Sequence, residues 1–186
     1  TSDKASTLYA RPVNLSGQLT LEDTSPVASV PVRIEGKSAS DDVWRLLGTA
    51  TTGPDGKFLT PILLGKSTKI KLVTEETWEL AKSSSNEIAI EVDRTISLSA
   101  PATMKSATPF AISGVVRPRI AGATVSLMKF SSGTWKNVAT ETTDEQGAFA
   151  FEISGEKRAL VRYQVIVEGD LTWRQVAAPE FSIIIR

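Results

Sequence analysis

Residues 49–58 read Thr-Ala-Thr-Thr-Gly-Pro-Asp-Gly-Lys-Phe, and residues 140–149 read Thr-Glu-Thr-Thr-Asp-Glu-Gln-Gly-Ala-Phe. A tryptophan, Trp44 or Trp135, stands 14 residues before the phenylalanine that ends each stretch. The same pattern of threonines, glycine and phenylalanine therefore occurs twice, 91 residues apart. A period of this length is far longer than the roughly 20 to 50 residues of a solenoid repeat, so each copy should bury a core of its own.

Shorter echoes extend the repeat on both sides. Ser16-Gly17 returns as Ser113-Gly114, and Thr77-Trp78 returns as Thr172-Trp173. The offsets drift slightly, to 97 and 95 residues, which indicates insertions in the loops between matching elements. The repeat thus covers most of the chain.

Composition supports two folded domains. Apolar residues make up 41% of the chain and charged residues 23%, which is ordinary for globular proteins. Each copy has about 90 residues, enough for a single core without metal or disulfide support. We predict one domain at residues 1–92 and a second at residues 93–186. The joint at Val92-Asp93-Arg94-Thr95 contains no glycine or serine-rich spacer, so we expect it to be short and semi-rigid.

Secondary structure is predicted to be almost wholly β-strand. Bulky apolar residues alternate with small or charged ones in residues 30–34, 88–92, 149–153 and 163–167. This period of two is typical of strands with one buried face. Short strands separated by turn residues favour two antiparallel sheets packed face to face in each copy. We therefore predict an all-β fold with two tandem antiparallel β-sandwich domains.

The repeated block has a local explanation. Threonines end a strand, a polar stretch turns, and Gly56 or Gly147 supplies a positive φ that other residues adopt with strain. Phe58 or Phe149 then enters the core. The block therefore predicts a turn between two strands in each copy.

Asp55 and Asp144 permit a second interpretation of this block, as calcium ligands. Neither lies in an alternating Asp-x-Asp-x-Asp loop with a trailing glutamate, which a calcium loop of that kind requires. We favour turn chemistry for both residues, because aspartate side chains readily hydrogen-bond their own backbone in turns. No metal site is predicted.

Composition also lowers the prospect of catalysis. The chain has no cysteine and no histidine, which removes thiol chemistry, the commonest metal ligand and the commonest general base near neutral pH. Carboxylate-only glycosidases, Ser-Lys hydrolases and carboxylate-bound magnesium sites remain chemically possible. Because no carboxylate pair is recognisable, we predict that the chain is not an enzyme and uses no cofactor.

Charge and hydropathy bear on partners. Lys plus Arg and Asp plus Glu number 21 each, so no overall field favours nucleic acid or an anionic membrane. No run of roughly 18 apolar residues is present to insert into a bilayer. The chain begins Thr1-Ser2-Asp3-Lys4 without a methionine or a hydrophobic leader, so we expect its natural N-terminus to lie upstream or to have been removed.

Three stretches of the second copy carry a family resemblance: residues 113–116 (Ser-Gly-Val-Val), 121–127 (Ala-Gly-Ala-Thr-Val-Ser-Leu) and 143–149 (Thr-Asp-Glu-Gln-Gly-Ala-Phe). They resemble the strand ends and turns of bacterial immunoglobulin-like modules, including carboxypeptidase-regulatory-like and Cna-B-like domains. The resemblance implies two tandem immunoglobulin-like antiparallel β-sandwich domains. It also implies a stalk, spacer or adhesive segment of a secreted or surface protein.

The chain departs from the Cna-B-like pattern in one respect. These domains often carry an isopeptide bond between a lysine of an early strand and an asparagine of the last strand. Residues 16–21 and 113–119 contain no lysine, and residues 181–186 contain no asparagine. Asn86 precedes the last strand of the first copy, and we interpret it as a loop residue.

Four tryptophans suggest a carbohydrate-binding interpretation, in which exposed indole rings stack on sugars. Packing is the stronger interpretation, because Trp44 matches Trp135 and Trp78 matches Trp173, as core or edge-covering residues of a duplicated sandwich would. Trp44 and Trp135 have polar neighbours and are the more plausible exposed pair. They are the candidate ligand-binding residues.

Two further features leave alternatives open. Basic residues of the second domain either form one patch or are scattered, solvated charges. These residues are Arg117, Arg119, Lys157, Arg158 and Arg162. Residues 74–82 have the composition of a short helix, but their counterpart at residues 171–179 favours a strand that ends at a proline. We predict strand for both segments.

The sequence thus predicts a non-catalytic structural or interaction module of a secreted or cell-surface bacterial protein, extracellular and monomeric. Its partners would be other domains of the same polypeptide, with a glycan or a surface protein as a further possibility. The alternative is a carbohydrate-binding accessory module attached to an extracellular enzyme.

Overall fold

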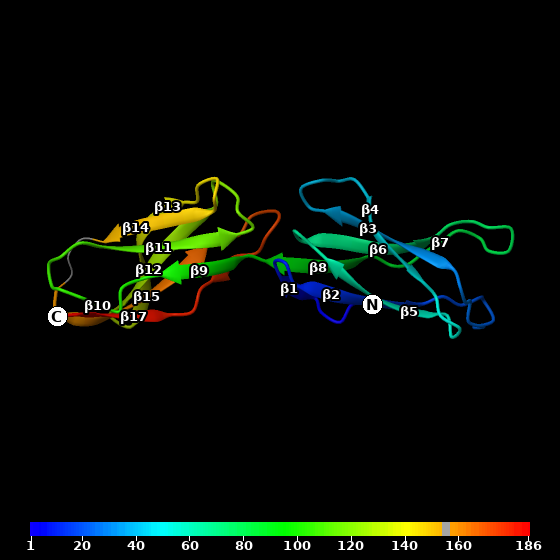
Figure 1. The fold of residues 1–186 in the computed structure, drawn as a ribbon, viewed down its shortest axis with the longest axis horizontal. Helices are drawn as coiled ribbons and strands as arrows, with labels where there is room; N and C mark the ends of the chain where they lie inside the picture. Colours follow the sequence, from blue (N-terminus) through cyan, green and yellow to red (C-terminus); the bar gives the residue numbers. More distant parts are fainter. Residues whose placement is uncertain (154–156) are drawn as a thin grey trace. The chain divides into compact units, whose positions relative to one another are not determined.

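The computed structural model describes residues 1–153 and 157–186 (Figure 1). All regular structure in these ranges is β-strand; they contain no helix, and so none able to cross a membrane. The chain divides into two compact units. Unit 1 comprises Thr1–Asp93 and Leu171–Trp173, and unit 2 comprises Arg94–Asp170 and Arg174–Arg186.

Unit 1 is built from two sheets. The larger has the order β1-β8-β6-β3-β4, with β7 paired to β6, and the smaller pairs β2 with β5. The strands are β1 (Ser6–Leu8), β2 (Pro12–Gln18), β3 (Pro31–Ser38), β4 (Arg45–Thr51), β5 (Lys57–Leu63), β6 (Thr68–Thr74), β7 (Ser83–Ser84) and β8 (Ile88–Asp93). The core between the sheets consists of Val13, Leu15, Ile34, Ile62, Leu64, Ile70, Ile90 and Val92.

Unit 2 repeats this plan. Its larger sheet has the order β10-β17-β15-β12-β13, with β16 paired to β15, and its smaller sheet has the order β14-β11-β9. The strands are β9 (Thr95–Ser99), β10 (Thr103–Met104), β11 (Phe110–Arg117), β12 (Thr124–Ser131), β13 (Thr134–Thr142), β14 (Ala148–Ile153), β15 (Ala159–Val167), β16 (Val176–Ala177) and β17 (Phe181–Ile185).

The large sheets of the two units match strand for strand. In each large sheet, the strand that comes first along the chain, β1 or β10, pairs in parallel with the strand that comes last, β8 or β17. The other ladders are antiparallel. A register irregularity falls at Ile34/Glu35 in β3 and at Leu127/Met128 in β12. The chain therefore has the predicted all-β fold of two tandem immunoglobulin-like β-sandwich domains.

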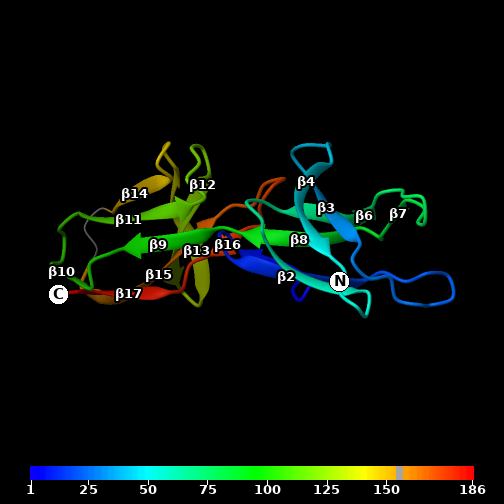
Figure 2. The same ribbon diagram turned by 45° about the vertical axis from the view of Figure 1, so that its right-hand side comes forward.

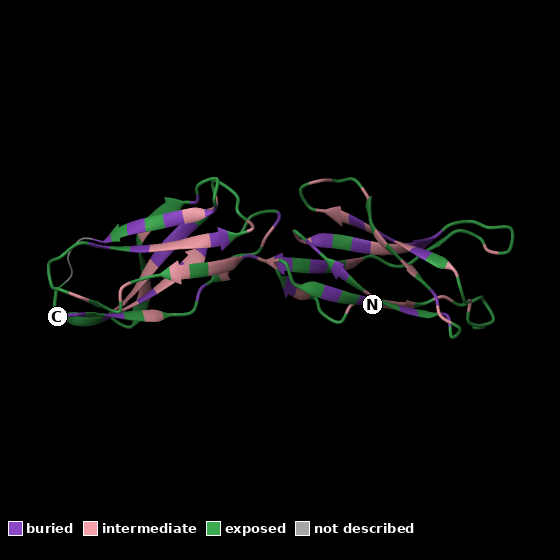
Figure 3. Ribbon diagram, viewed as in Figure 1, coloured by how far each residue is buried: buried purple, intermediate pink, exposed green. Residues whose placement is uncertain are grey.

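Alternating hydrophobicity explains why these strands form sandwiches. Along β14, Phe149, Phe151 and Ile153 are buried, while the residues between them are less buried or exposed (Figure 3). A strand of this kind covers its apolar face only against a second sheet. The turn before β14 has Gly147 at a φ of 70°, and its counterpart Gly56 has 71°, which confirms the predicted turns.

One strand of unit 2 is only partly matched in unit 1. β9 pairs along β11 from Ser113 to Arg117, on the side of β11 opposite to β14 (Figure 2). The corresponding edge of β2 is paired only at its start, where Ser2 bridges Leu15 and the Ser16 amide donates to the Thr1 carbonyl at 2.9 Å. Among the described residues, no strand continues this pairing beyond Ser16.

The structure corrects the strand prediction for residues 74–82. β6 ends at Thr74, and the following residues form a loop up to β7. The Thr77 hydroxyl accepts a hydrogen bond from the Leu80 amide at 3.0 Å, and the Thr77 amide donates to the Leu80 carbonyl at 2.8 Å. Local side-chain bonding of this kind competes with strand ladders. Likewise, residues 171–179 contain only the two-residue strand β16.

Candidate functional site

Trp44 lies in the loop between β3 and β4, where two lysines approach its ring. The Nζ atom of Lys71, on β6, is 4.2 Å from the ring centre, and that of Lys37, on β3, is 5.4 Å away. Ammonium groups over an indole are attracted by its π electrons, by about 0.5–1 kcal/mol at exposed sites. The half-buried ring is therefore engaged by cations rather than left open to a flat ligand on that side.

The lysines at Trp44 are themselves paired with carboxylates. Lys37 Nζ lies 2.8 Å from an Asp42 oxygen, and Lys71 Nζ lies 3.5 Å from a Glu35 oxygen. The hydrogen bond between Lys37 and Asp42 raises the pKa of the lysine ammonium and lowers the pKa of the carboxyl. Both groups are therefore held in their charged forms around neutral pH.

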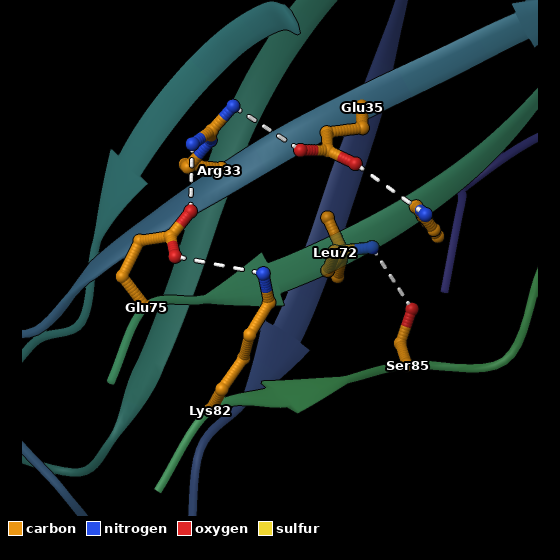
Figure 4. A network of polar contacts seen from close by, with 7 residues as sticks. Arg33, Glu35, Leu72, Glu75, Lys82 and Ser85 are labelled. Carbon is orange, nitrogen blue, oxygen red and sulfur yellow. Dashed lines mark hydrogen bonds and ion pairs between the residues drawn. The ribbon is translucent and has the colours of Figure 1, made fainter. Parts of the chain in front are cut away.

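An ion-pair network continues from Glu35 along the same sheet (Figure 4). Arg33 contacts Glu35 at 3.2 Å and Glu75 at 2.6 Å, and Lys82 contacts Glu75 at 3.7 Å. These side chains come from β3 and from the loop after β6, and alternate in sign. The charges thus satisfy one another, and exposed pairs of this type contribute little to stability individually.

Trp135 lies on β13 in a different aromatic setting. Its ring meets that of Phe130, directly opposite on β12, edge to face at 5.3 Å. The guanidinium carbon of Arg162, on β15, lies 4.5 Å from the Phe130 ring centre and 5.6 Å from that of Trp135. Arg162 also bonds Glu180. In unit 1, continuing the β3–β4 register by one residue places Lys37 in the position of Phe130.

The other two tryptophans differ from the prediction. Trp78 is 91% exposed in the loop between β6 and β7, so it is neither a core nor an edge-covering residue. Trp173 is half-buried and packs against the core of unit 1. The exposed tryptophan is thus Trp78, whereas Trp44 and Trp135 are both half-buried. The matching Thr-Trp dipeptides do not mark equivalent places, because both lie in irregular loops.

Asp55 and Asp144 act within their own turns. An oxygen of Asp144 accepts hydrogen bonds from the amides of Gln146 and Ala148, both at 2.8 Å, and an oxygen of Asp55 accepts one from the Lys57 amide at 3.1 Å. These bonds confirm the turn interpretation. The described residues hold no cluster of three or more metal-ligating side chains.

The predicted basic residues of unit 2 do not act as one group. Arg162 is occupied by Glu180 and the aromatic rings, whereas Arg117, Arg119, Lys157 and Arg158 are exposed. Arg117 precedes a cis peptide bond to Pro118 at the end of β11. The interpretation of scattered solvated charges fits these positions.

Sequence reasoning missed a charged side chain, that of Arg94, which is deeply buried in unit 2. Arg94 separates β8 from β9 and is 3% exposed. Its guanidinium donates to the Glu168 carbonyl at 3.0 Å and bonds the Asp170 carboxylate. A lone arginine in a four-residue joint carries no sequence signal for burial, because its partners lie more than 70 residues further along the chain.

The buried polar side chains of the described residues are mostly threonines. They are Thr7, Thr52, Thr68, Thr74, Arg94, Ser126, Thr143 and Thr172. No lysine or asparagine is among them. Among the described residues, the groups with a shifted pKa are Asp23, Lys37 and Asp42, of which Asp23 and Asp42 are exposed and Lys37 is partly buried.

Comparisons with known proteins give structural likeness only. No protein family matches the sequence, and no curated protein matches it. Among solved structures, a tetra-tandem repeat from the extending region of a large adhesion protein is 17% identical, with a TM-score of 0.42, over 98% of this chain and 47% of that one.

Two further structures match at similar levels. A D1–D4 ectodomain fragment of ICAM-5 is 13% identical, with a TM-score of 0.49, over 98% of this chain and 52% of that one. A C-terminal 282-residue fragment of intimin, in complex with the intimin-binding domain of its translocated receptor, is 11% identical, with a TM-score of 0.42, over 96% and 61%. This chain thus spans about half the length of the chains it matches. We assign its fold class from the strand order and pairing of its own sheets.

Proposed function

We propose that this chain is a non-catalytic structural or interaction module of a secreted or cell-surface bacterial protein, serving as a stalk, spacer or adhesive segment. Its two domains, residues 1–92 and residues 93–186, fold independently and are monomeric. One observation carries the proposal: the large sheets of the two sandwiches have the same strand order, and most of the repeated residues lie in turns or in the cores. The resemblance to carboxypeptidase-regulatory-like and Cna-B-like modules supports it.

The chemistry of the surface supports a non-catalytic role. The chain has neither histidine nor cysteine, and the carboxylates around Trp44 are paired with lysines or arginines. A glycosidase needs two carboxylates facing each other across a cleft, one of them with a raised pKa. In the part of the chain that the structure describes, the carboxyl groups with a shifted pKa are those of Asp23 and Asp42, and both pKa values are lowered by hydrogen bonds to the carboxylate.

The domain proposal can be tested with the separate fragments 1–92 and 93–186. Each should show a β-type circular dichroism spectrum and a cooperative unfolding transition, and each should elute as a monomer in light-scattering chromatography. The fragment 1–92 lacks Leu171–Trp173, which belong to unit 1, so a fragment 1–93 mixed with a peptide of residues 169–175 is the matched control. Two unfolded fragments would contradict the proposal.

The functional proposal can be tested on the whole chain. A panel of polysaccharides and peptides should show no turnover, whereas an array of surface proteins should reveal a partner if the segment is adhesive. Turnover that is lost when one carboxylate is replaced would contradict the non-catalytic role.

Glycan binding is a second candidate, and the exposure of Trp78 favours it. A carbohydrate-binding accessory module should bind polysaccharide through an open indole face. On a glycan array, Trp78→Ala should then abolish binding, and Trp44→Ala and Trp135→Ala would show whether the half-buried rings take part. An array without signal for the unaltered chain would remove this candidate.

A further inference from the structure

Unit 1 has an open pocket at the end of its sandwich where the loop between β3 and β4 meets the turn between β5 and β6 (Figure 1). The pocket has a volume of about 360 Å³, within the usual range for ligand pockets. Leu64, which belongs to the core of unit 1, is among its lining residues. An apolar side chain that entered the pocket would therefore extend the core of the sandwich.

Three aliphatic side chains line this pocket although solvent reaches them. Val43 is 55% exposed, Leu47 is 39% exposed and Leu63 is 66% exposed. They come from the loop after β3, from β4 and from β5, so three separate elements bring them to one place. Apolar side chains that gather at one exposed place mark a binding site more often than single ones do.

A glycine leaves the space for the pocket. Gly36, on β3, lies beneath the Leu47 side chain, which a Cβ atom at this position would overlap, and that Cβ atom would also come within 2.9 Å of Thr68. In unit 2 the same register position holds Lys129, because each residue is the second after the irregularity in its strand. The glycine is therefore particular to the first copy and is not required by the repeated fold.

The charged lining residues give the pocket a net positive charge. They are Asp41, Arg45 and Lys66, one negative and two positive groups. Arg45 donates from Nε and Nη2 to Oδ2 of Asp41, at 2.9 and 2.6 Å. Lys66 donates to the Ser40 hydroxyl at 3.1 Å and belongs to none of the ion pairs formed by the described residues. The Lys66 ammonium therefore favours an anionic group in the pocket.

Further hydrogen-bonding groups narrow the chemistry of that ligand. The amides of Gly65 and Lys66, in the turn after β5, donate to no acceptor among the described residues. Both Arg45 bonds go to Oδ2 of Asp41, which leaves its Oδ1 atom able to accept another. The pocket thus offers donors for a carboxylate, an acceptor for an amide N–H and aliphatic contacts. The last residue of a polypeptide presents all three groups, whereas a fatty acid lacks the amide.

We propose that this pocket binds the carboxyl-terminal residue of a partner polypeptide, one with an aliphatic side chain such as that of leucine. The side chain would lie against Val43, Leu47 and Leu63, and the carboxylate would accept a hydrogen bond from Lys66. Hydrogen bonds between ionised groups are stronger than those between neutral groups, and capture of a terminal carboxylate is a recurring mode of peptide recognition. The inference goes beyond the role of stalk, spacer or adhesive segment and does not rest on it.

The test uses the ¹⁵N-labelled 186-residue chain and the peptide acetyl-Gly-Ser-Gly-Ser-Leu with a free carboxylate. Titration should produce saturable shifts in the amide signals of Gly36, Leu47 and Gly65. Two control peptides should bind about tenfold or more weakly. One is the same peptide with a carboxamide end, and the other is acetyl-Gly-Ser-Gly-Leu-Ser, which keeps the composition and charge but moves the leucine inward. Equal binding by either control, or no saturable shift, would overturn the proposal.

Octanoate distinguishes the two sources of an aliphatic carboxylate. It has an aliphatic chain and a carboxylate but no amide N–H to donate to Asp41. It should therefore bind about tenfold or more weakly than acetyl-Gly-Ser-Gly-Ser-Leu. Binding of octanoate as tight as that of the peptide, or tighter, would indicate a fatty-acid site and would contradict the proposal.

Two matched pairs of altered chains locate the site. Lys66→Gln should weaken peptide binding about tenfold or more, whereas Lys69→Gln, at a lysine outside the pocket, should leave it unchanged. Leu63→Ser should weaken binding likewise, whereas Leu59→Ser, on the same strand and also exposed, should not. None of these four side chains is buried, so all four chains should keep the circular dichroism spectrum of the unaltered chain. Undiminished binding by Lys66→Gln or by Leu63→Ser would refute the site.

Discussion

Gly114 and Phe149 lie directly opposite each other in the pairing of β11 with β14, and a Cβ atom on Gly114 would come within 2.6 Å of the phenylalanine ring. Gly17 and Phe58 have the same relationship in unit 1, where the distance would be 2.7 Å. The glycine of the repeated Ser-Gly pair and the repeated phenylalanine lie far apart in the sequence, but in each unit they are in contact with each other. The ring lies across the backbone of the facing strand, and only a glycine leaves room for it.

This contact predicts that Gly114→Ala lowers the free energy of unfolding by about 1–3 kcal/mol, the usual range for overpacking. The added methyl group would also come within 2.5 Å of the Ser97 carbonyl oxygen, a backbone atom that is held in place by β9. Gly17→Ala should be milder, because its close neighbours are side-chain atoms. Urea unfolding measures both effects. Gly48→Ala, with no atom within 4 Å, is the control, and a loss as large as that of Gly114→Ala would contradict the explanation.

The hydroxyl of Thr143 predicts a second effect on stability. This buried group accepts a hydrogen bond from the Ala123 amide at 3.0 Å and donates one to the Ile120 carbonyl at 2.6 Å. Thr143→Val keeps the shape but leaves both backbone groups unsatisfied, which should cost about 1–3 kcal/mol. Thermal unfolding should show a lower Tm for Thr143→Val and a smaller change for Thr143→Ser. If exposed Thr142→Val lowers the Tm equally, the hydrogen bonds are not the cause.

The turn glycine Gly147 should tolerate substitution less well than Gly133. Both have positive φ, 70° and 81°, where an alanine is strained by about 1–2 kcal/mol. A Cβ atom on Gly147 would in addition come within 2.5 Å of the Val116 carbonyl oxygen, whereas one on Gly133 meets nothing within 4 Å. Denaturant unfolding should therefore place Gly147→Ala at least about 1 kcal/mol below Gly133→Ala. Equal losses would show that φ strain alone matters.

Arg94→Met should destabilise unit 2 by about 1–3 kcal/mol, because it leaves the Glu168 carbonyl and the Asp170 carboxylate without their guanidinium partner. The value is below that of a fully buried ion pair, since the Asp170 side chain is 45% exposed and can be hydrated. Chemical unfolding followed by circular dichroism measures the change. Asp170→Asn keeps a polar partner for Arg94, so it should lower the free energy of unfolding by less than Arg94→Met does. A larger loss for Asp170→Asn would contradict this explanation.

The Lys37–Asp42 pair predicts a pH dependence. The folded pKa of Asp42 is lowered, so its contribution to stability is present above the unfolded value of about 3.9 and is lost as pH falls through the folded value. The folded pKa of Lys37 is raised, so its contribution is present below about 10.4 and is lost as pH rises through the folded value. The free energy of unfolding, measured from pH 2 to 12, should show the acid and the alkaline loss in the unaltered chain. Neither loss should appear in Asp42→Asn. Both losses will be small because Asp42 is exposed and the pair is screened by solvent.

How far the sequence predicted the site depends on whether a residue acts locally. Gly56, Gly147, Asp55 and Asp144 act within their own turns, so a local pattern was sufficient to assign them. Trp78 was predicted to pack and is exposed, because the Thr-Trp dipeptide is too short to specify an environment. The lysines over Trp44 could not be foreseen, since they come from two other strands whose register is a tertiary property.

The sequence by itself determined that this protein is two β-sandwiches, because alternating apolar residues and positive-φ glycines act over a few neighbouring residues and recur in both copies. Only the tertiary structure decided which groups bond the buried Arg94 and which side chains lie against Trp44, Trp135 and Trp173. Those features depend on contacts between residues far apart in the chain. Strand register sets them, and no local pattern encodes it.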